Sequence, residues 1–455
     1  MGEPAIGGRS RLPGRRWAAY AAASLAAVAL VSTLIILLFG GAILDGPGKR
    51  MLERAYGRAH AGSELRIGGL EYSPDADRLV ATSVTLESPD TKLEIERITL
   101  TGVRWETLLR RSWSPAALLA RTDLDATRID VAFHRSRYGI ACERLRTSAR
   151  DSVLLAESFE LRTLAGDEDY FSAREFRRTR YLLAMPEFRV LGLAYDEMLR
   201  GRSNRARSIR FSRPVFDAYV NRDKPSDPAR PPRRMVHEML ASLAQPLQVD
   251  SIAVVDGAVS YRDRVIAGDA PGVLSFADVG LTVADLANRT GDGDTIRLRA
   301  QGALMGAGVL KIRMSMPVAE PDFLLSYSGS LGAMDATCLN EYLNVSVRTR
   351  LNSCHVDNVA FAIEVVDGRA AGRMTASYRN LEIARLDKQT GESGGLKNSI
   401  VSFLANVFKI RSDNAADDSG SMKVGKVEYS RKPDDSFYNF VWRALKTGIL
   451  DVVCY

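Results

Sequence analysis

The chain has 455 residues, 46% of them hydrophobic, which is enough for one large or two medium domains with a buried core. Its 62 basic and 55 acidic residues give a net charge of +7, and its four cysteines and four histidines include no Cys-x-x-Cys pair, which argues against a zinc site. An uncharged segment near the N-terminus, ahead of a long polar chain, argues against most soluble enzymes and against nuclear or ribosomal roles.

The uncharged segment spans residues 17–44 and exceeds the roughly 20 apolar residues that cross a bilayer. We therefore expect an uncleaved transmembrane anchor. Arg15 and Arg16, which directly precede it, favour an orientation with residues 1–16 in the cytoplasm and the bulk of the chain on the other side of the membrane. A cleaved signal peptide is the alternative, because Gly40, Gly41 and Ala42 form a small-residue cleavage site. Basic residues flank the segment equally on both sides, so the positive-inside rule does not set the orientation.

Alternation of apolar and polar residues covers most of the remaining chain and predicts β-strands. One predicted strand has Val80, Thr82, Val84 and Leu86 on a single face. The same alternation occurs at residues 129–134, 296–301, 310–316, 359–365 and 373–379. Short turns such as Asp367-Gly368 favour antiparallel meanders in a mainly β fold.

Four segments instead have apolar residues at helical spacing: residues 47–60, 233–243, 396–409 and 435–453. A linker rich in proline precedes the second of these helices and predicts a domain boundary. We therefore expect an N-terminal β region at 45–224, a linker with a short helix at 225–245, a C-terminal β region at 246–433 and a C-terminal helix at 434–455.

Two basic clusters, residues 174–181 and 200–213, suggest contact with anionic lipid headgroups beside the predicted anchor. A solvated basic surface is the alternative interpretation. Cys338 and Cys354 flank a short segment and are the best pair for a disulfide outside the cytoplasm, with buried free thiols as the alternative.

Motifs for catalysis and cofactor binding are missing from the sequence. Residues 328–332 lack the spacing of a nucleophile elbow, and residues 391–399 share only the composition of a phosphate-binding loop. The acidic turn at 291–294 has too few carboxylates for an EF-hand. We therefore expect no enzyme activity, no cofactor and no metal site.

The order of the predicted segments resembles the AsmA-like envelope proteins of Gram-negative bacteria. The stretches that carry the resemblance are residues 64–88, 339–343, 372–386 and 437–453. The resemblance implies an N-terminal transmembrane helix followed by an elongated, curved antiparallel β-sheet groove with a few amphipathic helices. It also implies a single-pass inner-membrane protein whose bulk lies in the periplasm.

The function implied by the resemblance is lipid binding or lipid transport in support of cell envelope biogenesis and outer-membrane lipid homeostasis. Phospholipid is the expected partner, the outer membrane or another envelope protein is a further one, and nucleic acid is not expected. The alternative is a non-catalytic envelope scaffold or outer-membrane assembly factor with a closed β-core. The residues predicted to line the groove are Ile312, Met314, Met316, Val359, Phe361, Ile363, Met374 and Tyr378.

The predicted C-terminal helix is apolar on more than one face. Its main stripe consists of Phe437, Val441, Leu445, Ile449 and Val452, while Phe440, Trp442 and Leu450 lie away from it. Such a helix either covers the last strands as a lid or docks on a membrane or partner, where Arg443 and Lys446 would meet phosphates. The predicted docking residues are Phe437, Phe440, Trp442, Leu445 and Ile449.

Overall fold

The computed structural model describes residues 62–103, 122–229, 231–289, 295–318, 323–386, 410–416 and 421–454. The protein is mainly β, with a large antiparallel sheet and few helices, which confirms the prediction from alternation. Within these ranges no helix is long and apolar enough to cross a bilayer. The apolar segment at 17–44 and the helices predicted at 47–60 and 396–409 lie outside the described residues.

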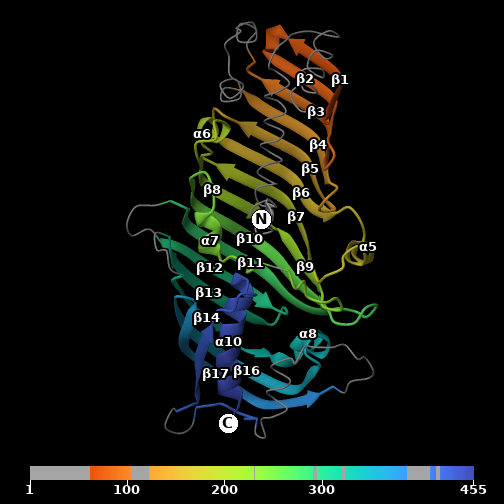
Figure 1. Cartoon of the computed structure of the whole chain (residues 1–455). Helices are drawn as coiled ribbons and strands as arrows, with labels where there is room; N and C mark the ends of the chain where they lie inside the picture. Colours follow the sequence, from red (N-terminus) through yellow and green to blue (C-terminus); the bar gives the residue numbers. More distant parts are fainter. Residues whose placement is uncertain are drawn as a thin grey trace, which may run out of the picture.

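The N-terminal half of the sheet is an antiparallel meander in which each strand pairs with the next along the chain (Figure 1). Its strands are β1 (Glu64–Ser73), β2 (Arg78–Glu87), β3 (Thr91–Thr101), β4 (Asp123–Phe133), β5 (Tyr138–Ser148), β6 (Val153–Thr163) and β7 (Thr179–Leu191).

The two halves of the chain meet at a parallel pairing. β8 (Asn204–Ser212) and β9 (Val215–Asn221) lie end to end and antiparallel to β7, and β10 (Leu247–Arg264) runs parallel to both. Parallel strands need a crossover connection, and residues 222–246 supply it. The proline-rich linker is therefore the crossover between neighbouring strands of one 18-stranded sheet.

Antiparallel pairing resumes after β10 and continues to the last strand. The remaining strands are β11 (Gly272–Ala287), β12 (Thr295–Leu304), β13 (Gly308–Pro317), β14 (Leu325–Leu331), β15 (Met334–Asp335), β16 (Thr349–Val366), β17 (Arg369–Arg385) and β18 (Val424–Ser430). β14 and the short β15 both pair with β16. The predicted turn at Asp367-Gly368 joins β16 to β17, and both residues have the positive φ that a tight hairpin turn of this kind requires.

A row of positions without ladder pairing crosses the N-terminal half, one in each strand, and the alternation of buried residues shifts by one residue there. In β2 the pairing skips Ser83, so the buried residues are Leu79, Ala81, Val84 and Leu86. Ser83, Arg128 in β4 and Ser158 in β6 have positive φ at equivalent places. The prediction that Val80 and Thr82 share a face with Val84 is wrong, because the positive φ of Ser83 interrupts the regular strand and changes which side chains point to that face.

The helices in the described ranges lie over parts of the sheet and at its edges. α5 (Asp167–Ser172) and α6 (Tyr195–Leu199) lie at opposite long edges, and η1 (Pro74–Ala76) joins β1 to β2 (Figure 1). α8 (Asn340–Ser346) follows η2 (Ala336–Leu339) and packs near β10, β11 and β16. The predicted helix at 233–243 is the shorter α7 (Val236–Ala241), and the one at 435–453 is confirmed as α10 (Phe437–Val453), which crosses β17 and β18. We call the sheet face under α10 the apolar face and the opposite one the polar face.

Candidate functional site on the apolar face

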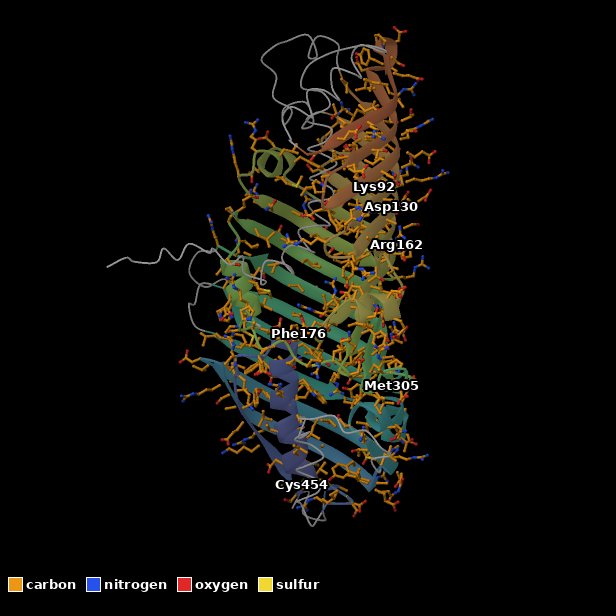
Figure 2. All side chains as sticks on the ribbon, turned by 45° about the vertical axis from the view of Figure 1, so that its right-hand side comes forward. Lys92, Asp130, Arg162, Phe176, Met305 and Cys454 are labelled. Atoms are coloured by element: carbon orange, nitrogen blue, oxygen red, sulfur yellow. The ribbon has the colours of Figure 1, made fainter. Side chains whose placement is uncertain are left out.

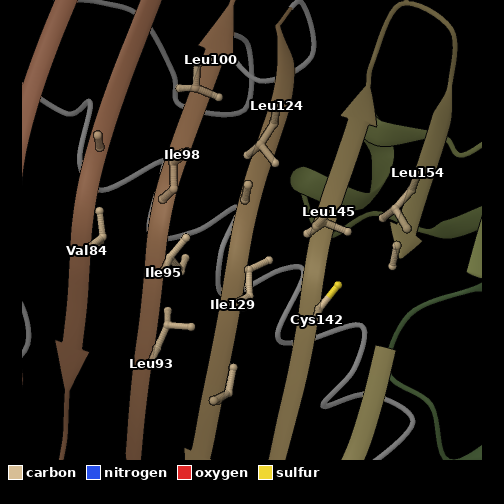
Figure 3. Close-up of a cluster of buried hydrophobic side chains, with 14 of the residues drawn as sticks. Val84, Leu93, Ile95, Ile98, Leu100, Leu124, Ile129, Cys142, Leu145 and Leu154 are labelled. Carbon is tan, nitrogen blue, oxygen red and sulfur yellow. The ribbon is translucent and has the colours of Figure 1, made fainter. Parts of the chain in front are cut away.

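Apolar side chains form unbroken rows across the strands on the apolar face. In the N-terminal half, the strand register places one residue of each strand in such a row. The row consists of Ile67, Val84, Ile95, Ile129, Cys142, Phe159 and Met185. Figure 3 shows Val84, Ile95, Ile129 and Cys142 side by side on neighbouring strands. Short-range alternation therefore becomes a long apolar strip once the strands are paired.

A second row continues across the parallel junction to the last strand. Its members are Leu154, Val190, Ile209, Ile252, Val283, Leu298, Met314, Tyr327, Ile363, Gly372 and Val427. The first row ends on β7 and the second begins on β6. Apolar side chains therefore follow the sheet without a break from β1 to β18.

The C-terminal end of the apolar face is packed beneath α7 and α10. Met235, which precedes α7, and Phe440 and Ala444 of α10 are fully buried in one cluster with residues of β12 to β18. Four of the residues predicted to line a groove, Met316, Phe361, Ile363 and Met374, belong to this cluster. The structure therefore places them in a packed core.

A small residue allows α10 to lie close to the sheet. A Cβ atom on Gly448 would come within 2.6 Å of Val427 Cγ2 and 3.2 Å of Met374 Cβ. The helix contacts the sheet through Phe440, Val441, Ala444, Gly448 and Val452, all of which are buried. Glycine thus serves here for the close approach of a helix backbone to side chains.

The predicted stripe of α10 is only partly the buried one. Val441 and Val452 pack against the sheet, but Ile449 is 38% exposed, and Tyr438 and Trp442 are 56% and 44% exposed. These three residues form an exposed apolar stripe on the side of α10 that faces away from β18. The spacing of large residues was misleading because the contact depends on Ala444 and Gly448, which a search for large apolar residues overlooks.

Tyr378 lies in a separate cluster at the end of α10. Its hydroxyl donates a hydrogen bond to the carbonyl oxygen of Arg411 at 3.1 Å, and burial raises its pKa to about 12. Cys354 packs in the same cluster, where burial raises the pKa of its thiol to about 11. Cys338 lies on η2, and both cysteines are free thiols, so the predicted disulfide is not formed in this structure.

The middle of the apolar face is less completely covered than its C-terminal end. Ile312, Met314 and Val359 are half-buried, and so are three aromatic residues that the sequence interpretation missed, Tyr181, Phe216 and Tyr261. The Tyr181 and Phe216 rings stack with centroids 5.9 Å apart, while Tyr261 lies 6.1 Å from Tyr342 and 6.5 Å from Tyr438. Apolar and polar residues alternate in the segments 210–223 and 249–263, which also contain aromatic residues. Only the parallel pairing of β9 with β10 brings these aromatic residues together.

Arg443 of α10 is engaged by the protein itself. Its guanidinium donates to Asp435 at 2.6 Å and to Asp434 at 3.2 Å, and it lies 3.4 Å from the Tyr429 hydroxyl. Burial opposes its charge, but these hydrogen bonds and the carboxylates outweigh burial and raise its pKa. Burial and the nearby Arg443 lower the pKa of Lys446 to about 8. The predicted role of Arg443 toward phosphates is therefore replaced by an ion-pair role within the fold.

The basic cluster at 174–181 is also used internally. Arg180 is fully buried and donates to Asp167 at 2.8 and 2.9 Å, and it pairs with Asp217 as well. Arg262 donates to the same Asp217 at 2.7 Å, and its guanidinium lies 4.5 Å from the centre of the Tyr219 ring. This charged cluster joins β7, β9 and β10 at the parallel junction and leaves Arg180 inaccessible to lipid headgroups.

Across the described ranges, no three His, Cys, Asp or Glu side chains are grouped so as to hold a metal ion. No protein-family model and no curated protein matches this sequence. The resemblance to AsmA-like proteins remains a prediction, and the apolar face is the feature from which a function can be argued.

Proposed function

We propose that the apolar face binds the acyl chains of phospholipids and serves as a lipid-binding or lipid-transfer groove. The observation that supports this most strongly is the pair of overlapping apolar rows that together cross the sheet from β1 to β18. Removing an acyl chain from water stabilises it by about 0.8 kcal/mol for each buried CH₂ group. An apolar strip supplies this stabilisation wherever its side chains are accessible, and it needs no catalytic residue.

The direction of the rows is compatible with an extended acyl chain. Strands in a sheet are about 4.8 Å apart, and the rows run across the strands, along the long axis of the sheet (Figure 1). An acyl chain lying along a row would meet a new apolar side chain at each strand.

The half-buried middle of the face, from β7 to β13, is the proposed lipid site. Phe216, Ile312 and Met314 offer apolar contact there, and Tyr181 and Tyr261 combine apolar rings with hydroxyl groups. Tyrosine suits the boundary between acyl chains and polar headgroups because one end is apolar and the other forms hydrogen bonds. The exposed stripe of α10, with Trp442 and Ile449, extends this apolar surface.

The cellular setting is part of the same proposal. The apolar segment at 17–44 is long enough for a transmembrane anchor, and the resemblance to AsmA-like proteins supports an inner-membrane tether with the sheet in the periplasm. A tethered groove of this kind would contribute to outer-membrane lipid homeostasis.

A non-catalytic envelope scaffold is the second candidate function. It is supported by the complete burial of apolar residues at both ends of the face, such as Leu93 and Val131 in the N-terminal cluster and Phe440 in the C-terminal one. In that case the apolar rows would serve only to pack a closed β-core, and no lipid would accompany the protein.

The two functions are separated by photocrosslinking at neighbouring residues on opposite faces. Phe216 points to the apolar face, whereas Val215 belongs to the polar face and is 55% exposed. We expect a benzophenone amino acid at position 216 to label co-purified phospholipid acyl chains, while the same residue at 215 does not. The greater exposure of Val215 makes it a stringent control, because nonspecific labelling would favour it.

Mass spectrometry of the crosslinked protein identifies the lipid and the labelled carbon. Equal labelling at both positions would indicate nonspecific contact and contradict the proposal. The same photoreactive residue can be placed at positions 312 and 314. If no lipid is labelled from position 216, 312 or 314 in folded protein, the scaffold function is favoured.

A further inference from the structure

The polar face of the N-terminal half carries cations that are paired with carboxylates. Lys92 pairs with Glu94 at 2.6 Å, Arg144 with Asp125 at 2.5 Å, and Arg146 with Glu157 at 2.5 Å. Arg162 pairs with Asp130, and Figure 2 shows Lys92, Asp130 and Arg162 following one another along the sheet. This half of the polar face therefore carries ion pairs within β3 and between strands of the β4–β6 region.

The polar face of the C-terminal half is organised differently. The register from β12 to β18 places Arg299, Arg313, Ser328, Ala362, Arg373 and Lys426 in one row. The adjacent row contains Gln301, Lys311, Ser330, Ala360, Thr375 and Val424. Neither row contains a carboxylate. We call these two rows the basic strip.

Several cations of the basic strip have no ion-pair partner among the described residues. Arg299 and Arg313 lie directly opposite each other on β12 and β13, an arrangement of like charges that is destabilising in a sheet. By contrast, Arg297 in the following row pairs with Asp285 at 2.7 Å, and Lys426 pairs with Glu428 at 2.5 Å. A negative ligand over Arg299 and Arg313 would relieve their repulsion.

The side chains at the centre of the basic strip are short. Ser328 and Ser330 on β14 and Ala360 and Ala362 on β16 lie between the long side chains of Lys311 and Arg313 on one side and Arg373 on the other. Val309 and Val424 on the same face are 47% and 46% exposed. The surface thus combines long basic side chains, two exposed valines and a centre made of serine and alanine side chains.

We propose that the basic strip docks on the surface of a bilayer rich in anionic phospholipid. Its strands span roughly 24 Å at the usual strand spacing, and a row of arginines with interspersed apolar side chains suits headgroups at an interface. Glu364 and Glu428 in the next row mark the border of the strip. This inference does not depend on lipid binding to the opposite, apolar face.

The test uses the full chain held in phosphatidylcholine nanodiscs and asks whether it is captured by separate vesicles. The vesicles contain either phosphatidylcholine alone or equal parts phosphatidylcholine and phosphatidylglycerol, and capture is measured by flotation. We expect capture by the anionic vesicles only, weakened by added salt because the interaction is between exposed charges.

A triple variant, Arg299→Gln, Arg313→Gln and Arg373→Gln, should lower capture on the order of 100-fold, since each basic residue near an anionic surface contributes about fivefold. The matched control is Arg78→Gln, Arg97→Gln and Arg150→Gln, which removes three exposed arginines from the N-terminal half and should leave capture unchanged. The melting temperature of the first variant should stay equal or rise, because the Arg299–Arg313 repulsion is removed.

Equal capture by neutral and anionic vesicles would overturn the proposal, as would equal losses in the two triple variants. Absence of capture by any vesicle, with binding to an acidic protein instead, would also overturn it. Failure here leaves acyl-chain labelling at Phe216 unaffected, so the two proposals fail separately.

Discussion

Asp217 is the carboxylate on which the charged cluster at the parallel junction depends. It lies between the fully buried Arg180 and the partly buried Arg262. Burial alone would raise its pKa, but the hydrogen bonds from Arg262 and Arg180 outweigh burial and lower it. A lowered pKa in the folded state means that the ionised carboxylate stabilises the fold above its unfolded pKa near 3.8 and that this stabilisation is lost as the pH falls below that value.

We expect Asp217→Asn to lower the free energy of unfolding at neutral pH by about 3 kcal/mol, because it leaves the buried Arg180 with one carboxylate in place of two. Urea unfolding at a series of pH values measures the effect, and the gap from the wild type should narrow as the pH falls below 3.8. Asp125→Asn is the control, since its ion pair with Arg144 is largely exposed and such pairs contribute about 0–1 kcal/mol. If the difference in unfolding free energy between Asp217→Asn and the wild type stayed constant with pH, the lowered pKa of Asp217 would be contradicted.

At the scale of residues, the sequence indicated where basic side chains gather but not what they do. The cluster at 174–181 is visible in the sequence, yet the partners of Arg180 come from Asp167 on α5 and Asp217 on β9. Pairing across such separations depends on the strand register, which no local pattern contains. The basic strip has the same origin, because Arg299, Arg313 and Arg373 belong to three different strands.

At the scale of elements, α10 provides the sharpest contrast between its two sides. Phe440 is fully buried against the rings of Phe323 and Tyr429, whereas Trp442 is 44% exposed. We expect Phe440→Ala to lower the free energy of unfolding by about 3–5 kcal/mol, as is usual for buried aromatic residues. Trp442→Ala should change it by only about 0.5 kcal/mol, as surface substitutions do.

Thermal and urea unfolding of the two variants measure this difference, and lipid content by native mass spectrometry shows what the exposed stripe does. If Trp442 extends the lipid site, Trp442→Ala should retain stability but co-purify with less phospholipid. A large loss of stability in Trp442→Ala would instead show that both sides of α10 are packed.

The existence of α10 and of most strands could be predicted because amphipathic spacing is a local property. Its buried face could not, because the close contact is made by Ala444 and Gly448 and large apolar residues drew the prediction to another side. The shifts of alternation within the N-terminal strands were also missed, although buried residues at i, i+2, i+5 and i+7 recur, as in Leu79, Ala81, Val84 and Leu86 of β2. A search that allowed one shift of phase in each strand would have found them.

At the scale of the whole molecule, the mainly β architecture follows from the sequence, but its continuity does not. A proline-rich linker normally separates domains, and the sequence offers no sign that β10 returns to lie parallel to β8 and β9. That pairing joins the two halves into one sheet. It also determines that the aromatic residues at the centre of the apolar face come from both halves, with Phe216 on β9 and Tyr261 on β10.

This continuity predicts the behaviour of a chain cut in the linker. A protease site inserted after Pro228, which is exposed, should be cleaved without unfolding the protein. The fragments should stay together, because β10 pairs with β8 and β9, Arg222 donates to Asp263 at 2.6 Å, and Arg262 bonds Asp217 across the cut.

Size-exclusion chromatography should therefore show one particle that contains both fragments, and they should separate only in denaturant. The uncut protein with the same insertion is the control for effects of the inserted sequence. Fragments that separate in native buffer and keep their own β-structure would instead mean that the linker divides two independent domains. The second apolar row would then end at β8 and begin again at β10, and the continuous apolar row along the sheet would be lost.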